Sequence, residues 1–355
     1  MKILLLTRYD RTGPSSRYRF YQFLPYLEKE RFDVSVSPLF NEKYVDNLYS
    51  DQRAIKFLNP LGGYLKRISK SLFYHSYDLV WMEKEALPWI PQFIEKLLFK
   101  TSVPYVIDYD DAVFHRYDQH PNFLVRNLLS RKIEGIMARS TVVVAGNRNI
   151  ADYAQRAGVQ KVEILPTVLD LSRYRMKDTI DSPSFTIGWV GSPSTSKHMS
   201  IAAGALRNFC RNEDVEFRAL GALQKDLDEI PGKLIPWNAE TETEELTCFD
   251  VGIMPLPDTP WERGKCGFKI IQYMAAGLPV IASPVGVNSE IVEHGVNGFL
   301  ARDTKEWIEY FELLRGDPDL GRQMGARGRK KVEEKYSLDV IAPRLIAILE
   351  EAAQA

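Results

Sequence analysis

The sequence has few cysteines and no long apolar run. Its three cysteines, Cys210, Cys248 and Cys266, are widely spaced among 355 residues, without a CxxC pair or a Cys/His spacing suited to zinc. This excludes a disulfide framework and a common zinc site, and it fits a reducing cytoplasm. No run of about 18 uncharged apolar residues occurs, and residues 2–6 read as a strand rather than a signal peptide. We therefore expect a chain that is neither membrane-spanning nor secreted by that route.

The G-x-G-x-x-G fingerprint of dinucleotide-binding proteins is also absent after the first predicted strand. The loop over residues 7–19 has one glycine, Gly13, followed by Arg17 and Arg19. This disfavours an NAD-dependent dehydrogenase. Gly13 would let the backbone approach a ligand just before a helix N-terminus. Side chains two positions apart on a helix face different ways, so we expect one of the two arginines to be a surface charge.

Length and apolar content suit two hydrophobic cores, because 45% of the 355 residues are apolar. The net charge of −1 hides an asymmetry. The first 170 residues carry roughly five more basic than acidic side chains, and the rest roughly six more acidic ones. Within the basic half, residues 65–73 alternate apolar residues with three cations. This segment predicts either a helix on an anionic lipid surface or a surface helix with a solvated basic face.

Short apolar segments alternate with amphipathic ones, which is typical of parallel sheets wrapped by helices. A helix is predicted over about residues 16–28. The sequence thus predicts two doubly wound α/β domains with a boundary near residues 170–184. The predicted strands are residues 2–7, 33–38, 78–82, 104–107, 141–145, 162–165, 185–190, 215–220, 249–254 and 279–282.

The most informative motif runs over residues 264–286. It predicts a glycine-containing loop, a helix of about eight residues beginning near Phe268, and a buried strand after Gly277 and Pro279. A helix N-terminus offers free backbone N–H groups and the positive end of the helix dipole, and Lys265 and Lys269 add charge beside it. The motif therefore predicts a diphosphate-binding site.

This motif resembles the donor-binding region of family 4 of the retaining glycosyltransferases, which have the GT-B architecture. The similarity continues through residues 283–300, and residues 166–174 and 190–192 resemble further segments of the family in chain order. The resemblance implies two Rossmann-like domains facing across a cleft. Residues 1–170 would form the acceptor-side domain, residues 171–336 the nucleotide-sugar-binding domain, and residues 337–355 a helix packing back toward the first domain.

The resemblance also implies which residues bind the donor. Lys197 and Glu290 are expected at the phosphates and the ribose; as alternatives, lysines at helix ends are solvated charges, and Glu290 stabilises a helix N-terminus. The expected donor-binding residues are Gly13, Arg17, Gly191, Ser192, Lys197, Lys265, Gly267, Phe268, Lys269, Gln272 and Glu290.

Two departures from the family pattern concern the donor. The family's two glutamates, eight residues apart, would fall at Gly264 and Gln272, and neither is acidic. Gln272 can still hydrogen-bond ribose hydroxyls, and Glu262 is expected to reach toward the sugar. The arginine that follows the family's phosphate-loop glycine is replaced by Ser192, for which Lys265 and Lys269 are expected to compensate.

Residues 108–111, Asp-Tyr-Asp-Asp, follow the predicted strand over residues 104–107. They contain a D-x-D spelling, but the resembling family carries a His-Asp pair at this strand end, close to the transferred sugar. Asp110 and Asp111 would occupy those two positions. We expect Asp110 to bind a sugar hydroxyl, orient the acceptor or act as its general base. The alternative is that either aspartate caps a helix.

The expected function is transfer of a sugar from a nucleotide-sugar, with retention, to a glycan or lipid-linked acceptor in cell-surface polysaccharide or glycolipid biosynthesis. The nucleotide-sugar is a co-substrate; no other cofactor, no required metal ion and no nucleic acid partner is expected. We expect a cytoplasmic protein, with peripheral contact to the inner face of the membrane through the basic N-terminal domain. Alternatives are a sugar-nucleotide epimerase or hydrolase, and a non-catalytic subunit that binds nucleotide-sugar.

Overall fold

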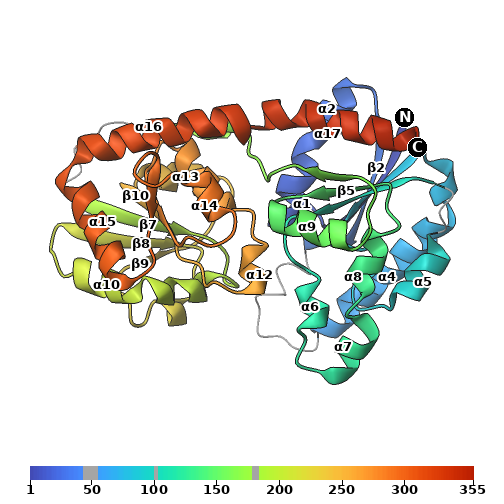
Figure 1. Cartoon of the computed structure of the whole chain (residues 1–355), viewed down its shortest axis with the longest axis horizontal. Helices are drawn as coiled ribbons and strands as arrows, with labels where there is room; N and C mark the ends of the chain where they lie inside the picture. Colours follow the sequence, from blue (N-terminus) through green and yellow to red (C-terminus); the bar gives the residue numbers. More distant parts are fainter. Residues whose placement is uncertain (43–54, 100–102, 178–183) are drawn as a thin grey trace. The chain divides into compact units, whose positions relative to one another are not determined.

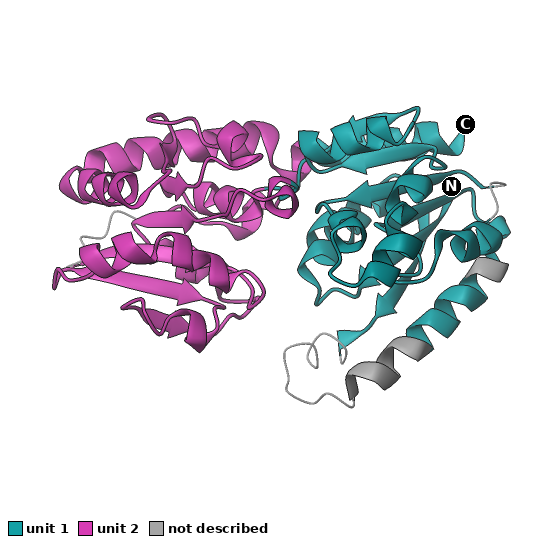
Figure 2. Cartoon of the chain, turned by 60° about the horizontal axis from the view of Figure 1, so that its bottom comes forward, with its two compact units in different colours: residues 1–167, 264–266, 341–355 teal, residues 168–263, 267–340 magenta. Residues whose placement is uncertain are grey.

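The computed structural model of the chain describes residues 1–42, 55–99, 103–177 and 184–355. The chain forms two compact units (Figure 2). Unit 1 comprises Met1–Thr167, Gly264–Cys266 and Ile341–Ala355, and unit 2 comprises Val168–Arg263 and Gly267–Val340. Part of the expected boundary region, residues 178–183, lies outside the described residues.

Unit 1 is built on a six-stranded parallel sheet in the order β2-β1-β3-β4-β5-β6. Its inner strands are apolar runs buried on both faces; the side chains of Ile3 to Leu6, for example, are fully buried. Such runs are expected where helices cover both faces of a parallel sheet. The strands are β1 (Lys2–Tyr9), β2 (Asp33–Phe40), β3 (Leu79–Glu83), β4 (Tyr105–Tyr109), β5 (Val142–Ala145) and β6 (Val162–Ile164).

Helices of unit 1 flank this sheet, and Figure 1 shows their arrangement. They are α1 (Pro14–Arg19), α2 (Leu24–Lys29), α4 (Ile55–Leu72), α5 (Gln92–Leu98), α6 (His115–Asp118), α7 (Phe123–Leu129), α8 (Lys132–Met137) and α9 (Arg148–Arg156).

The single helix predicted over residues 16–28 is wrong, because the chain forms α1, a 3-10 turn over Tyr21–Phe23 and then α2. Phe20 leaves the helical region with φ −132°. Pro25 lies in the first turn of α2 and has no N–H to donate to the preceding turn. The proline therefore suits the start of a new helix and not the interior of a continuous one.

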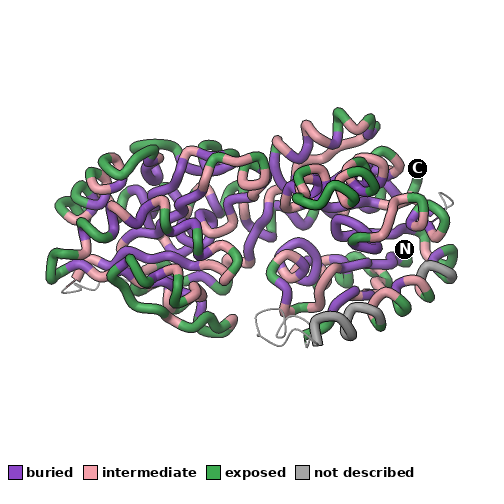
Figure 3. Tube along the Cα trace, turned by 90° about the horizontal axis from the view of Figure 1, so that it is seen from below, coloured by how far each residue is buried: buried purple, intermediate pink, exposed green. Residues whose placement is uncertain are grey.

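Unit 2 has a second six-stranded parallel sheet, ordered β12-β11-β10-β7-β8-β9. Successive residues of its strands enter two different cores, so that Trp189 packs in one and Val190 in the other. This alternation follows from the two-residue period of a strand and buries both faces (Figure 3). The strands are β7 (Phe185–Val190), β8 (Val215–Leu220), β9 (Lys233–Ile235), β10 (Val251–Met254), β11 (Val280–Ala282) and β12 (Gly298–Leu300).

One core of unit 2 lies under α13 and α16, and the other under α10 and α15. The helices are α10 (Ala203–Phe209), α11 (Glu242–Thr247), α12 (Pro260–Arg263), α13 (Phe268–Ala275), α14 (Asn288–Ile291), α15 (Thr304–Gly316), α16 (Pro318–Lys335) and α17 (Leu338–Ala353).

Each predicted strand is present, but β9 and β12 were not predicted. Both are three residues long and pair at an outer position of the sheet. In β9 Lys233 and Leu234 are exposed, so no buried apolar run marks the strand. Strands this short carry too little periodicity to be recognised from sequence.

The expected return of the C-terminal helix to the first domain is confirmed. Residues Ile341–Ala355, which include most of α17, group with unit 1. Arg344 donates to the carbonyl of Ile164, and Lys161 pairs with Glu351. Among the described residues, no helix is long and apolar enough to cross a membrane.

We predict that Gly188→Ala destabilises unit 2 strongly. A Cβ at Gly188, in the middle of β7, would overlap the ring of Phe249, which is fully buried. Overpacking of this kind costs about 2 kcal/mol or more. Urea unfolding should show the loss, whereas Gly316→Ala, where a Cβ would meet no atom within 4 Å, should change stability by less than about 0.5 kcal/mol.

Candidate functional site

The first group of candidate residues lies at the carboxyl edge of the sheet in unit 1. β3 and β4 are neighbours in register, with Glu83 opposite Asp108. Because the two strands are parallel, the segments that follow them, residues 84–85 and 110–111, leave the sheet at the same edge. Ligands of open α/β sheets bind at this edge.

Lys84 organises this edge. It is buried, and its backbone has a φ of +62°, a left-handed conformation that costs a non-glycine residue about 1 kcal/mol. Its ammonium lies 2.7 Å from Oδ1 of Asp110 and 3.8 Å from Oδ2 of Asp111. Burial alone would raise the pKa of Asp110, but the Lys84 charge and hydrogen bond override it and lower the pKa to about 2.

The low pKa narrows the expected roles of Asp110. A carboxylate that holds a proton only near pH 2 is a weak base at neutral pH, so general base catalysis is disfavoured. The same carboxylate remains a strong hydrogen-bond acceptor for a hydroxyl. The sequence signal for Lys84 is its position directly after a buried strand, at the carboxyl edge of the sheet, where the acceptor side is expected.

Asp111 pairs with Lys265, which the sequence had placed beside the donor diphosphate. The Lys265 ammonium lies 2.8 Å from Oδ1 of Asp111. Burial lowers the pKa of Lys265, but Asp111 more than offsets this, so the pKa is raised and the lysine stays charged. The structure thus divides the predicted donor motif, since Lys265 groups with unit 1, and Phe268 and Lys269 with unit 2.

The described residues do not bring three carboxylate, imidazole or thiolate groups together as a metal site would require. The aspartates of the D-x-D spelling are instead paired with cations. Asp108 binds Arg19 through two contacts of 2.8 and 2.9 Å, and Asp110 and Asp111 face Lys84 and Lys265.

Of the two arginines of the first loop, one of which was expected to be a surface charge, Arg19 is buried and Arg17 is half-buried. Arg19 is 4% exposed, and its guanidinium also donates to the carbonyl of Leu165. Burial raises the pKa of Asp108 to about 6 despite this arginine. Arg17, the expected donor contact, is half-buried and lies over the Tyr18 ring at 4.8 Å.

Gly13 is the N-cap of α1 and is buried. A Cβ at this position would overlap the side chain of Tyr9. The side chain of Tyr9 therefore occupies the space beside Gly13. A contact between the backbone of Gly13 and the donor stays a prediction.

The second group of candidate residues lies in unit 2, at the carboxyl end of β7. There Lys269 of α13 lies 3.2 Å from the hydroxyl of Thr195 and 4.6 Å from the centre of the Trp189 ring. A Cβ at Gly191 would come within 2.7 Å of the Lys269 side chain, so the glycine gives the lysine room. Ser192 is half-buried, and its hydroxyl bonds that of Ser194. The loop, the lysine and the indole thus form one cluster.

The start of α13 is where the sequence predicted it. Gly267 is its N-cap and has φ +64°, and a Cβ there would lie 2.5 Å from Ile291. The first helical residue, Phe268, is half-buried, and Lys269 follows it. The Lys269 ammonium therefore lies close to the N-terminal end of a helix, where the helix dipole is positive.

Glu262 is held by two neighbours in unit 2. Thr259 donates its hydroxyl to one carboxylate oxygen, and Nε2 of His198 lies 3.6 Å from the other. Its expected reach toward a sugar stays a prediction. His198, which sequence reasoning did not single out, lies next to the predicted Lys197 and is buried, whereas Lys197 is exposed.

The two positions that depart from the family pattern are enclosed by neighbours. A Cβ at Gly264 would overlap Ala112 within unit 1, and its carbonyl accepts a 2.8 Å hydrogen bond from Asn147. Gln272 in unit 2 is 2% exposed, with Nε2 3.2 Å from the hydroxyl of Tyr174. No side chain larger than hydrogen fits at position 264 without a shift.

Glu290 lies on α14 and is exposed. Its backbone carbonyl accepts a hydrogen bond from Lys331, and the ribose contact expected of its carboxylate stays a prediction.

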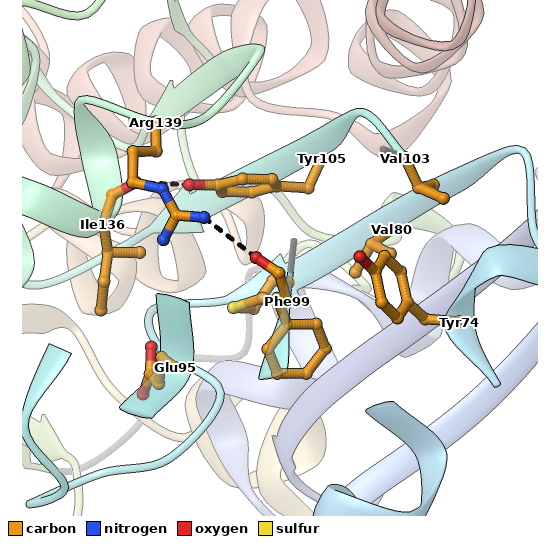
Figure 4. A pocket seen from close by; sticks show the side chains of 9 residues that line it. Tyr74, Val80, Glu95, Phe99, Val103, Tyr105, Ile136 and Arg139 are labelled. Carbon is orange, nitrogen blue, oxygen red and sulfur yellow. Dashed lines mark hydrogen bonds between the residues drawn. The ribbon is translucent and has the colours of Figure 1, made fainter. Parts of the chain in front are cut away.

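A small cavity in unit 1 lies away from these residues (Figure 4). Its volume of about 20 Å³ fits about one water molecule, not a nucleotide. Tyr105 donates to the carbonyl of Ile136, and Arg139 to that of Phe99, so its polar groups hold neighbouring segments together.

We predict that Lys84→Met raises the pKa of Asp110. The carboxyl should then titrate above about pH 4 in a carbon-detected NMR titration, since burial acts without the opposing cation. In the native chain the lowered pKa stabilises the folded state above pH 3.8, and this contribution of about 2 kcal/mol is lost as the pH falls through 2. Lys84→Arg keeps a cation and should keep the low pKa; an unchanged pKa in Lys84→Met would contradict the assignment.

The second half of the chain matches a known family. Residues 184–317 match the family model described as glycosyl transferases group 1. Spore coat protein SA of Bacillus subtilis is 27% identical over 151 residues, which are 41% of this chain and 37% of that protein. A sucrose synthase of Denitrovibrio acetiphilus is 34% identical over 86 residues, which are 22% of this chain and 11% of the enzyme. The chain thus covers well under two thirds of either relative.

Solved structures resemble the chain over nearly its whole length. HepE of Anabaena, in complex with UDP, is 18% identical with a TM-score of 0.69, covering 99% of this chain and 100% of that one. Sucrose-phosphate synthase from Thermosynechococcus elongatus is 15% identical with a TM-score of 0.74, covering 99% and 98%. At these identities the likeness establishes the fold. Residues 184–317 thus match the glycosyl transferases group 1 model, in line with the resemblance, within a chain that shares the GT-B fold of these structures.

Proposed function

We propose that this protein transfers a sugar from a nucleotide-sugar donor to a hydroxyl acceptor, with retention of the anomeric configuration. The observation that carries the proposal is the cluster of Lys269, Thr195 and Trp189 at the start of α13. It lies within the residues that match the glycosyltransferase family. Retention is proposed from the resemblance to family 4.

The cluster suits the chemistry of the leaving group. Cleavage of the anomeric bond releases a nucleoside diphosphate, so negative charge grows on the phosphate in the transition state. The Lys269 ammonium, the Thr195 hydroxyl and the first N–H groups of α13 are donors fixed by the fold before any ligand binds. Donors placed in advance stabilise developing charge without a reorganisation cost.

Unit 1 contributes Asp110 and Asp111, which we assign to the acceptor and the sugar. Because Lys84 keeps Asp110 ionised, we propose that Asp110 accepts a hydrogen bond from a hydroxyl and orients it, rather than removing its proton. Asp111 shares its charge with Lys265 and supports the same edge.

UDP-glucose is the first donor to test, because HepE of Anabaena has been solved with UDP and with UDP-glucose. We propose a glycan or lipid-linked acceptor of the cell surface, a cytoplasmic site of action at the inner face of the membrane, no required metal ion and no nucleic acid partner. The lysine and the helix N-terminus supply the positive charge that a metal ion supplies in other transferases.

A non-catalytic subunit that binds nucleotide-sugar is the second candidate. It is favoured by Gly264, where the family has a glutamate and where a side chain would overlap Ala112. Such a subunit would bind the nucleoside diphosphate and turn nothing over with any acceptor.

We predict that UDP, GDP or another nucleoside diphosphate raises the melting temperature without Mg²⁺. A ligand at about 100 times its Kd stabilises by about 2.7 kcal/mol, which a thermal-shift assay resolves. Lys269→Ala should raise the Kd about 10- to 100-fold, as expected for one charge-assisted contact. Lys305→Ala, an exposed lysine of α15, is the matched control and should bind normally. Equal binding by both variants would remove Lys269 from the phosphate site.

We predict that Asp110→Ala leaves nucleoside diphosphate binding unchanged and lowers turnover at least about 100-fold, because the acceptor loses its orienting contact. Transfer to acceptor is measured with a radiolabelled sugar nucleotide. Full turnover in this variant would exclude Asp110 from the reaction. Donor binding without turnover in the native chain, across an acceptor panel, would instead favour the non-catalytic candidate.

A further inference from the structure

Large apolar side chains stand out into solvent on two helices of unit 1. Phe93 and Leu97 of α5 and Phe123, Leu124 and Leu128 of α7 are each 63–70% exposed. Single exposed apolar residues are common on protein surfaces, but a group on neighbouring helices marks an interaction surface. We call these five side chains the α5–α7 surface.

The two helices are joined by an aromatic contact. Trp89, three residues before α5, is 45% exposed and lies 5.6 Å from the ring of His120, three residues before α7. Its ring also packs edge-on against Tyr117 of α6 at 5.3 Å. The starts of α5 and α7 are therefore neighbours, and we treat their exposed side chains together as one surface.

Helix α4 extends this surface, because it packs against α5. Leu65 and Lys66 of α4 are exposed, as is Phe73 just after it. Arg67, one of the three cations in the basic segment, is buried instead and donates to the carbonyls of Thr7 and Ser37. The helix predicted from residues 65–73, either on a lipid surface or with a solvated basic face, therefore presents fewer charges than its sequence implied. The side chains of Ser71 and Leu72 lie outside the described residues.

The segments that form the surface carry mostly positive charge, and the acids at their borders are Asp78, which is exposed, and Asp118, whose side chain is 33% exposed. Residues 119–133 contain no aspartate or glutamate, and neither do residues 52–77. In α5 Lys96 is exposed, whereas Glu95 is buried 3.1 Å from Lys132. The Arg131 side chain is 82% exposed and forms an ion pair with Glu134.

We propose that the α5–α7 surface docks onto an anionic lipid surface. Aromatic and leucine side chains flanked by the exposed cations Lys66, Lys96 and Arg131 complement a layer of anionic headgroups above acyl chains. A protein partner of ordinary composition would offer no such uniform negative field. The proposal names the membrane contact of the proposed function, but it concerns residues outside the donor cluster.

Docking here would place unit 1, which carries Asp110, against the membrane. An acceptor with a lipid anchor would then reach the protein from the surface on which the protein lies. Transfer becomes a reaction confined to two dimensions, which raises the effective acceptor concentration.

The test is co-sedimentation of the full chain with vesicles of phosphatidylcholine, with or without phosphatidylglycerol. The native chain should sediment with the anionic vesicles, and Phe123→Ser/Leu124→Ser/Leu128→Ser should lower its partition coefficient at least roughly ten-fold. Leu313→Ser/Val340→Ser, which changes exposed apolar residues of unit 2, is the matched control and should bind as the native chain does. Lys66→Glu/Lys96→Glu should weaken binding to anionic vesicles alone.

Absence of sedimentation with anionic vesicles, or equal loss in the control, would overturn the proposal. So would a native dimer that the triple variant converts to a monomer in light scattering, because the surface would then bind a second copy. Melting curves identify a variant that fails to fold, and Lys66→Glu/Lys96→Glu leaves the apolar residues intact. Because sedimentation needs no donor, its failure is distinguishable from failure of the transferase proposal.

Discussion

Every described strand of both sheets pairs in parallel, and the arrangement of the candidate residues depends on this constraint. Parallel strands end at one edge, so the loops that follow them are gathered there without any contact between the loops themselves. In unit 1 this edge carries Lys84 and Asp110; in unit 2 it carries Gly191 beside Lys269. Each cluster is thus set by its own sheet.

Electrostatic compensation shapes the cluster of unit 1. Asp108 is buried, Asp110 and Asp111 beside it are half-buried, and three carboxylates this close together would repel each other strongly if unpaired. Arg19, Lys84 and Lys265 supply one cation to each. Lys84 accepts a left-handed backbone to do so, which is the kind of local strain that accumulates at functional sites.

In unit 2 the position of the cation depends on glycine and not on pairing with carboxylates. Gly191 leaves room for Lys269, and Gly267 lets the chain turn into α13 beside Ile291. The cluster has one lysine and one hydroxyl at the start of α13. The chain differs from the resembling family at Ser192, Gly264 and Gln272, where that family has an arginine and two glutamates.

The sequence by itself determined ten of the twelve described strands and the start and length of α13, because apolar runs and glycine or proline signals act locally. Only the tertiary structure decided which charges meet. Lys84 and Asp110 are far apart in the chain, Arg19 is buried rather than solvated, and Lys265 groups with unit 1. Ion pairing and burial depend on distances between residues that are far apart in the chain, and the sequence pattern alone does not give these distances.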